Sequence, residues 1–253
     1  MHSAPYDNIV KHLKTPLPNW AMHEPGCGKI MMNLPGVREL CIERVGEAMI
    51  GTVPYCSCDK QTELNARTRF IQAGLPAGFP KTLQNFVMRS GTEDASAAAQ
   101  DFLDMSKTPP VLTFSGTVGS GKSHLAEAIT REILIAGHSA RYELVSDLLR
   151  KLRPPDDGAV DLRDATMNAC TNAYLLWLDD AFSEKPSEWA ADQLFQLIDE
   201  RVRNRRRLIV TTNHNPNTMP KIFYRITDRL MDTQTGTSRW VTIDASSYRT
   251  NRE

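Results

Sequence analysis

The sequence predicts an α/β domain built on a largely parallel sheet. From Val111 onward, short strand-like segments alternate with segments whose apolar residues have helical spacing, a pattern typical of parallel α/β sheets. Residues 174–178 are apolar throughout, as a strand buried on both faces of such a sheet must be. A glycine-rich turn joins the first strand to the first helix, where α/β folds often bind phosphate groups.

Five short segments are predicted to be strands. The first is apolar and follows two prolines, and the third is the fully apolar run. In chain order they are 111–115, 141–145, 174–178, 208–212 and 239–243.

The predicted helices are recognised by the spacing of apolar residues and by signals at their ends. In the first helix, Leu125, Ile129 and Ile133 have helical spacing, and Gly137 ends the helix. Ser146 is a suitable N-cap for the second helix. The five helices are predicted at residues 123–136, 147–152, 164–171, 188–204 and 221–231.

The composition is that of an ordinary globular protein. Of the 253 residues, 41% are hydrophobic and 24% are charged, which excludes a mostly disordered chain. The chain has 30 Lys and Arg against 30 Asp and Glu, so it is not a globally basic nucleic-acid coat, although a local basic patch is compatible with this balance. The longest apolar run is far shorter than the ~20 residues of a membrane span. Residues 1–14 have no apolar signal-peptide core, and we therefore expect a cytoplasmic protein.

The chain is predicted to have two domains. Three stretches have the composition of linkers or turn-rich loops, namely 74–80, 90–99 and 153–158. The regular alternation of strands and helices begins only after the first two of them. We place a boundary near residues 75–85, with an N-terminal domain at 1–80 and the α/β domain at 81–253.

The N-terminal domain contains a candidate zinc site. One histidine and three cysteines form it: His23, Cys27, Cys56 and Cys58. Four nitrogen and sulfur ligands suit a tetrahedral structural Zn²⁺, and small irregular domains often need a metal because their core is small. Free thiols with a surface histidine are the alternative. The odd count of five cysteines fits reduced thiols better than a disulfide framework.

The glycine-rich turn matches the phosphate-loop pattern GxxxxGK[ST] in full. Its glycines let the backbone curl so that successive N–H groups point at phosphate oxygens, and the helix that follows adds its N-terminal dipole. Lys122 can reach the β- and γ-phosphates of ATP, and the Ser123 hydroxyl can bind Mg²⁺. The eight residues of the loop are Gly116, Thr117, Val118, Gly119, Ser120, Gly121, Lys122 and Ser123.

Two further strand ends carry polar groups that suit this chemistry. Asp179 and Asp180 follow the fully apolar strand; the first can hold Mg²⁺ and the second can orient and polarise the attacking water. Asn213, with Thr212 as second choice, ends the next strand, where an amide can position that water. Considered alone, such a tip is more often the start of a β-turn.

Two sets of arginines allow both a functional and a structural interpretation. Arg225 and Arg229 lie four residues apart on one predicted helix, where they can reach the γ-phosphate of a neighbouring subunit or form a solvated salt-bridge face. The run at 201–207 has five arginines in seven positions. It is a candidate contact for a nucleic-acid backbone, and it is also suited to a helix C-terminus, which favours cations.

Together these motifs resemble those of the AAA+ ATPases. In finer detail they resemble the replicative helicase loaders of the DnaC/DnaI type and their transposition relative IstB. The likeness covers most of residues 55–253, and the cysteine-rich start is similar to the zinc-bearing N-domain of DnaI-like loaders. Beyond the phosphate loop and the strand ends, the segments that carry it are 70–86, 192–201, 208–213, 225–230, 238–243 and 247–249.

The resemblance implies a fold and a set of roles. The fold would be an ASCE-type sheet with strand order 5-1-4-3-2 and without the helical lid domain of many AAA+ proteins. Lys122 and Ser123 would hold phosphate and Mg²⁺, and Asp179 would serve Mg²⁺. Asn213 would be sensor 1. Asp180 would take the position of the catalytic acid, which is Glu in many P-loop ATPases; the shorter arm would slow hydrolysis or require another water position.

The resemblance also implies an assembly and a function. Arg229 is the first choice for a trans-acting arginine finger, with Arg225 as its neighbour or the alternative, and the active form would be a ring or spiral joined through the ATP sites. The protein would load a hexameric, DnaB-type replicative helicase onto single-stranded DNA, with the N-terminal domain gripping the helicase. The alternatives are an IstB-like regulator that binds a transposase and duplex DNA, and a nucleotide-bound adaptor with little turnover, which Asp180 suggests. A metabolite kinase is disfavoured because no extra substrate-binding segment is visible.

Overall fold

The computed structural model describes residues 68–104, 110–154, 162–183 and 187–248, together with the backbone of four short strands before residue 52. The chain forms two compact units, Met1–Thr68 and Arg69–Glu253. This division falls earlier in the chain than the predicted boundary after Pro80, which stays a prediction.

The first unit contains an antiparallel sheet whose strands follow one another in chain order. The strands are β1 (Trp20–Met22), β2 (Lys29–Met32), β3 (Leu40–Val45) and β4 (Ala48–Gly51). The four candidate zinc ligands, His23, Cys27, Cys56 and Cys58, lie outside the described residues. The zinc site therefore stays a prediction.

The second unit is built on a five-stranded sheet in the order β6-β7-β8-β5-β9. Every neighbouring pair is parallel. Numbered in chain order and read from β9, this is the order 5-1-4-3-2, so the predicted parallel α/β sheet and its order are confirmed. The strands are β5 (Val111–Gly116), β6 (Ala140–Leu144), β7 (Leu175–Ala181), β8 (Arg207–Thr212) and β9 (Ser238–Ile243).

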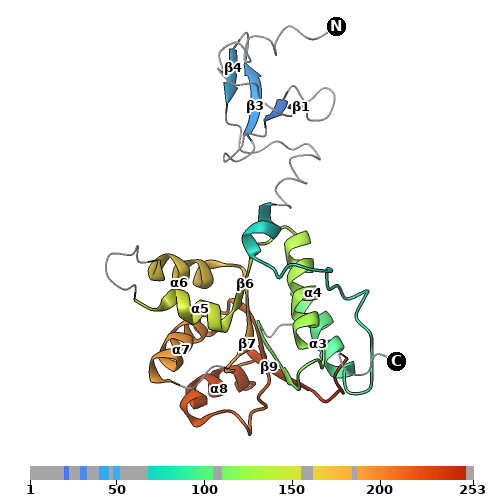
Figure 1. Ribbon diagram of the computed structural model, residues 1–253, viewed down its shortest axis with the longest axis vertical. Coiled ribbons are helices and arrows are strands. Elements are labelled where there is room, and N and C mark those ends of the chain that lie inside the picture. Colours follow the sequence, from blue (N-terminus) through green and yellow to red (C-terminus); the bar gives the residue numbers. More distant parts are fainter. Residues whose placement is uncertain are drawn as a thin grey trace. The chain divides into compact units, whose positions relative to one another are not determined.

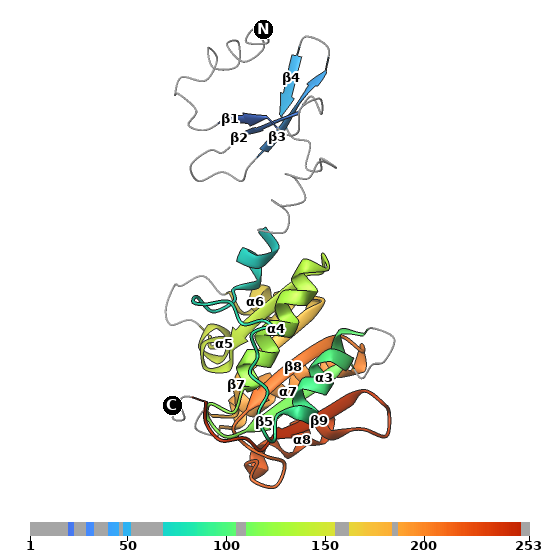
Figure 2. The same ribbon diagram turned by 90° about the vertical axis from the view of Figure 1, so that its right-hand side faces the viewer.

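Helices cover both faces of this sheet, as Figures 1 and 2 show. One face carries α3 (Glu93–Leu103) and α4 (Lys122–Ile135). The opposite face carries α5 (Val145–Leu152), α6 (Arg163–Asn172), α7 (Glu188–Arg203) and α8 (Tyr224–Met231). A short 3-10 turn, η1 (Lys221–Phe223), leads into α8.

The fully apolar strand shows why the sheet needs both layers. Leu175 and Trp177 pack with the core beneath α3 and α4, whereas Leu176 and Leu178 pack with the core on the opposite face. All four are fully buried, since alternate side chains of a strand point to opposite faces. The apolar run therefore identified a central strand correctly.

One linker prediction is wrong. The stretch 90–99 contains the start of α3, which begins at Glu93 and buries Ala95, Ala98, Ala99 and Phe102. Alanine is the strongest helix former, and its small side chain lets the helix lie close to α4. The glycine and serine residues in this stretch suggested a linker, but the alanines determine its structure.

The basic run at 201–207 mainly stabilises the fold. Arg201 is 0% exposed, and its guanidinium donates hydrogen bonds to carbonyl oxygens at the end of α6 and beside β7. The acceptors are the carbonyls of Cys170, Thr171, Ala173, Tyr174 and Arg207. A cation at the C-terminus of a helix satisfies carbonyls that have no partner within the helix.

Two more arginines of the run are also held by the protein. Arg206 donates to Thr171 O and to Asn172 Oδ1, and Arg207 is buried with its guanidinium 4.1 Å from the centre of the Phe102 ring. The structural interpretation is thus confirmed for these positions. Of the five arginines of the run, only Arg203 and Arg205 are exposed, so the predicted nucleic-acid patch does not include the whole run.

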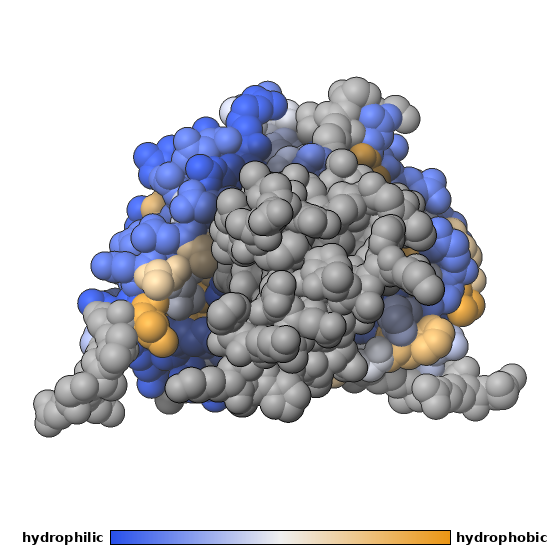
Figure 3. All heavy atoms as spheres, turned by 90° about the horizontal axis from the view of Figure 1, so that it is seen from above, coloured by the Kyte–Doolittle hydropathy of each residue, from blue (hydrophilic) through white to orange (hydrophobic). Residues whose placement is uncertain are grey.

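The described surface shown in Figure 3 is mainly hydrophilic, with small separate hydrophobic patches. Among the helices of the described segments, none has the length and apolar character needed to cross a membrane. The cytoplasmic location stays a prediction.

Candidate nucleotide-binding site

The phosphate loop runs from the end of β5 into the first turn of α4. Two of its glycines are required by their surroundings. Gly116 has a φ of 144° and Gly119 a φ of 82°, a region that side chains rarely adopt. A Cβ on Gly116 would lie 2.4 Å from the Ile243 carbonyl oxygen, and one on Gly119 would lie 2.2 Å from Ser247 Oγ. The loop can curl in this way only because these positions lack side chains.

Lys122 points back into the loop that precedes it. Its Nζ donates hydrogen bonds to the carbonyl oxygens of Gly116 (2.8 Å) and Thr117 (2.7 Å), and the residue is 7% exposed. The ammonium is therefore held inside the curl of the loop, beside the N-terminus of the 14-residue helix α4. A buried cation and a helix N-terminus together favour a bound phosphate group.

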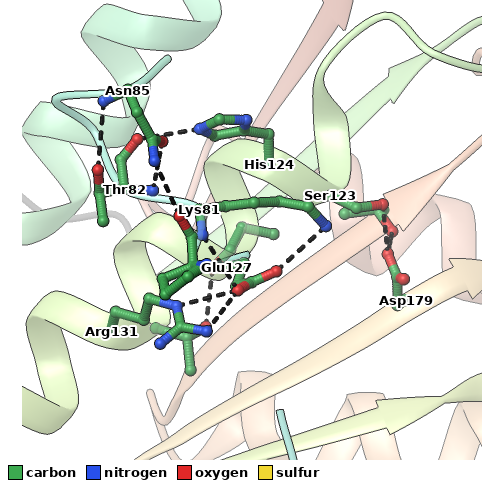
Figure 4. A network of polar contacts seen from close by, with 12 residues as sticks. Lys81, Thr82, Asn85, Ser123, His124, Glu127, Arg131 and Asp179 are labelled. Atoms are coloured by element: carbon green, nitrogen blue, oxygen red, sulfur yellow. Dashed lines mark hydrogen bonds and ion pairs between the residues drawn. The ribbon is translucent and has the colours of Figure 1, made fainter. Parts of the chain in front are cut away.

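Ser123 and Asp179 are brought together by α4 and β7. Ser123 Oγ donates to Asp179 Oδ1 at 2.8 Å, and Thr211 Oγ1 donates to the same oxygen at 2.5 Å; Figure 4 shows the first of these bonds. A hydroxyl beside a carboxylate suits Mg²⁺, which takes oxygen ligands and is usually completed by waters and substrate phosphates. The residues fit this ion. Among the described residues, no cluster of three or more His, Cys, Asp or Glu side chains forms a metal site of its own.

A β-bulge places Asp179 and Asp180 at one site. Leu178 pairs with Val210 and Ala181 pairs with Thr212, so two aspartates on β7 lie opposite one residue on β8. Neighbouring residues of a regular strand point to opposite faces, whereas a bulge redirects one of them. Asp180 has a φ of 52°, a conformation that is uncommon for a residue other than glycine and is found at functional sites.

The single residue opposite the bulge, Thr211, connects the two carboxylates. Its hydroxyl donates to Asp179 Oδ1 and accepts the backbone N–H of Asp180 at 3.0 Å. Thr211 is not among the site residues that the sequence predicts. A signal was present, since Thr211 lies on β8 only two residues before Asn213, which follows the end of that strand. Thr212, our second choice for the polar tip, is buried and accepts the His214 backbone N–H instead.

Asn213 lies beside Asp180, and its role in positioning water stays a prediction. Asn213 Nδ2 donates to Asp180 Oδ1 at 2.9 Å, and Ser183 Oγ donates to the same oxygen at 2.6 Å. Both Asp180 and Asn213 are exposed. Ser183 is a second residue that the sequence did not indicate, because it follows the strand and reaches back to Asp180 only through a turn.

The chain before α3 is attached to α4 by the polar network in Figure 4. Glu127, which is 2% exposed, pairs with Lys81 at 3.1 Å and with Arg131 at 2.7 Å. The Nε2 atom of His124 lies 3.0 Å from the Thr82 carbonyl oxygen. Burial lowers the pKa of His124, so the neutral ring donates through Nε2–H to that carbonyl.

A cavity of about 490 Å³ opens between this segment and the phosphate loop. Phe86 lies edge-on to His124 with ring centres 5.2 Å apart, and Tyr248 lines the cavity while its backbone N–H donates to the Gly119 carbonyl oxygen at 3.0 Å. Arg89 donates to the carbonyls of Ser246 and Ser120. Aromatic walls beside a phosphate loop suit the base of a nucleotide.

The two arginines of α8 are held by α7. Arg229 Nε donates to Asp199 Oδ1 at 2.8 Å, and this bond raises the pKa of Arg229. The guanidinium of Arg225 lies 3.7 Å from the centre of the Phe195 ring. Among the described residues, the side chains of Arg225 and Arg229 contact α7 and Asp228. Neither is seen to contact the phosphate loop within this described part of the chain.

The fold and this site define the class: a P-loop nucleotide-binding protein of the AAA+ type. The sequence profile described as "IstB-like ATP binding protein" matches residues 75–253. The chain therefore belongs to the family of IstB-like ATP-binding proteins, and the resemblance seen in the sequence is confirmed.

Named relatives come from replication and from an insertion sequence. The replicative helicase loader DnaC of Escherichia coli (strain K12) is 31% identical over 137 residues, which cover 54% of this chain and 55% of that protein. An ATP-binding protein in an insertion sequence of Mycobacterium tuberculosis is 30% identical over 137 residues, covering 53% of each chain. The chain thus spans about half the length of the curated relatives it matches.

Solved structures share the fold. A crystal structure of the DnaC helicase loader has a TM-score of 0.53 at 22% identity, covering 64% of this chain and 96% of that one. The replication initiator DnaA bound to AMPPCP and single-stranded DNA has a TM-score of 0.57 at 20% identity, covering 66% of this chain and 50% of that one.

Proposed function

We propose that this protein is an ATPase that loads a hexameric, DnaB-type replicative helicase onto single-stranded DNA. The observation that carries the proposal is the meeting of Ser123, Asp179, Asp180 and Asn213 beside a phosphate loop, in a chain that is 31% identical to a replicative helicase loader over 137 residues. The helicase partner and the gripping role of the N-terminal domain at residues 1–80 are carried over from that similarity.

In the proposed reaction, the phosphate loop binds the β- and γ-phosphates of ATP. The loop N–H groups and the N-terminus of α4 face the phosphate oxygens, and Lys122 exchanges its carbonyl contacts for them. Ser123 and Asp179 would hold Mg²⁺, which would neutralise charge on the two phosphates.

Asp180 is the proposed proton acceptor, and Asn213 orients the attacking water beside it. The water oxygen forms a bond to the γ-phosphorus, its proton passes to Asp180, and the bond from that phosphorus to the bridging oxygen breaks as ADP leaves. Asp is one methylene shorter than Glu. The bulge and the φ of 52° move Asp180 out of the regular strand path, so the carboxylate does not occupy the position that a regular strand would give it.

The arginines of α8 are the proposed contribution of a neighbouring copy. Arg229, or Arg225 in its place, would stabilise the charge that develops on the γ-phosphate. Both are partly or fully exposed and already oriented by α7, so little side-chain ordering would remain to be done on assembly. Full hydrolysis would then require self-association.

The test is ATP hydrolysis by the full chain with single-stranded DNA, with duplex DNA, and with neither. A loader is expected to be stimulated by single-stranded DNA, and Arg229→Ala should lose hydrolysis while keeping ATP binding. Mixing Arg229→Ala with Lys122→Ala should restore part of the activity, since each variant supplies what the other lacks. The absence of hydrolysis under every condition would contradict the proposal.

The second candidate is a transposition regulator that binds a transposase and duplex DNA. It is favoured by the family description and by the relative from an insertion sequence. Hydrolysis stimulated by duplex rather than single-stranded DNA, together with filaments formed on duplex DNA, would select this candidate.

A further inference from the structure

Among the described residues, the hydrogen-bond donors to the carboxylate of Asp180 reach only one of its two oxygens. Ser183 Oγ and Asn213 Nδ2 both donate to Oδ1, at 2.6 and 2.9 Å. Within the described part of the chain, the hydrogen bonds to this side chain all end on Oδ1. Oδ2 belongs to the same exposed carboxylate and receives no hydrogen bond from the described residues.

The turn that carries Ser183 is fixed by a buried anchor. Phe182 has a φ of 68°, which is rare for an aromatic residue. Phe182 is 2% exposed, and its ring lies 5.0 Å from that of Phe223, the last residue of η1. Such a conformation persists only where the surrounding structure determines it. Because Phe182 is buried, the chain turns back and brings the Ser183 hydroxyl to Asp180.

A carboxylate needs such contacts if it is to keep one orientation. The terminal torsion of an aspartate is broad and roughly two-fold, so an exposed carboxylate can turn either oxygen toward its surroundings. Two donors on Oδ1 fix the plane of the group. They are also charge-assisted hydrogen bonds, which are shorter and stronger than neutral ones.

We propose that Ser183 is a positioning residue for ATP hydrolysis, holding Oδ1 of Asp180 so that Oδ2 alone accepts the proton of the attacking water. The inference rests on the proposed role of Asp180. In the step, the water oxygen bonds to the γ-phosphorus, the water proton moves to Oδ2, and the bridging oxygen leaves with ADP carrying the bonding electron pair.

Ser183 differs in this from Asn213. The Asn213 amide has a second N–H that can turn toward the γ-phosphate or the water, so its removal changes several contacts. Ser183 has one O–H, and that bond is given to Asp180. A change at Ser183 therefore tests the orientation of the carboxylate with fewer other effects.

The experiment compares Ser183→Ala, Ser183→Thr and the control Ser187→Ala in the full chain, with ATP and single-stranded DNA. Ser183→Ala should lower kcat about tenfold with KM and ATP affinity unchanged, as a general base out of alignment loses part of its effect. Ser183→Thr keeps the hydroxyl and should recover most of kcat. Ser187 caps α7 through the Ala190 N–H, so Ser187→Ala should lower the melting temperature and leave kcat unchanged.

Two results would overturn the inference: a wild-type kcat in Ser183→Ala, or an equal loss in Ser183→Ala and Ser183→Thr. The Asp180→Asn variant distinguishes the positioning role of Ser183 from the proposed function. Wild-type hydrolysis by Asp180→Asn would refute the role of Asp180 itself, whereas its inactivity beside a fully active Ser183→Ala would refute only the positioning role. Adding Ser183→Ala to Asp180→Asn should lower the rate no further.

Discussion

Replacing Arg201 with alanine should be among the most destabilising single changes in the α/β unit. The guanidinium is fully buried and donates to five carbonyl oxygens between α6 and β8. At about 1 kcal/mol net for each hydrogen bond, their loss amounts to about 5 kcal/mol, and water entering the space recovers part of it. Burial also lowers the pKa of Arg201 to about 10, because removing the charge from water is unfavourable. The alanine variant has no charge to bury, which reduces the net loss of stability.

We therefore expect Arg201→Ala to lower the free energy of unfolding by about 3–5 kcal/mol, the range for removing one side of a buried charged network. Urea unfolding followed by circular dichroism measures this change. Arg201→Lys should recover only part of the loss, because one ammonium cannot span carbonyls that the two terminal nitrogens of arginine reach.

Arg203→Ala is the matched control from the same helix end. Its side chain is 67% exposed and pairs with Asp199 and Glu200, and exposed ion pairs contribute less than about 1 kcal/mol. If Arg201→Ala and Arg203→Ala cost the same within about 1 kcal/mol, the structural role assigned to the basic run would be refuted.

The remaining predictions concern the site and the N-terminal unit. Lys122→Ala should weaken ATP binding at least about tenfold by removing the cation inside the loop, and unchanged affinity by calorimetry would contradict the assignment of the loop. Thr211→Val should cost about 1–3 kcal/mol and slow hydrolysis, because it leaves the Asp180 N–H without its acceptor; Thr211→Ser should restore both, and an unaffected Thr211→Val would disprove the bridge. Burial lowers the pKa of His124 below its ordinary 6.5, so the unfolded chain takes up the proton first and stability should fall as the pH drops below about 6.5. In urea unfolding, His124→Gln should make the free energy of unfolding less dependent on pH. The same pH dependence in the variant and the wild type would contradict this role of His124. Purified full chain should contain zinc that a chelator removes while the α/β unit stays folded, and metal-free protein would exclude the zinc site.

The parts of the site that depend on local sequence could be predicted. The loop from Gly116 to Ser123 carries its glycines, lysine and hydroxyl in consecutive positions, and its place between an apolar strand and a helix can be read from hydrophobic spacing. Asp179 lies near the carboxyl end of β7 and Asn213 follows β8, and the ends of neighbouring parallel strands meet at one edge of a sheet. Local pattern and tertiary position agree at these residues.

The remaining parts depend on tertiary structure that the sequence does not signal. The bulge at Asp179 and Asp180 depends on the pairing of β7 with β8, and without it Thr211 has no evident connection to both acids. Ser183 reaches Asp180 only because Phe182 is buried against Phe223. The arginines at 201–207 look alike in sequence, and only the packing of α6 against α7 distinguishes the buried Arg201 from the exposed Arg203.

The central claim, that this ATP-binding chain loads a replicative helicase, is tested most directly by mass measurement in solution. The full chain is mixed with the hexameric helicase of the same cell or phage, and light scattering is recorded with ATP, with ADP and with no nucleotide. We expect a complex of defined mass whose stability differs between ATP and ADP, and the Lys122→Ala variant should lose that difference. If no complex forms with any nucleotide, the loader proposal is contradicted and the transposition regulator takes its place.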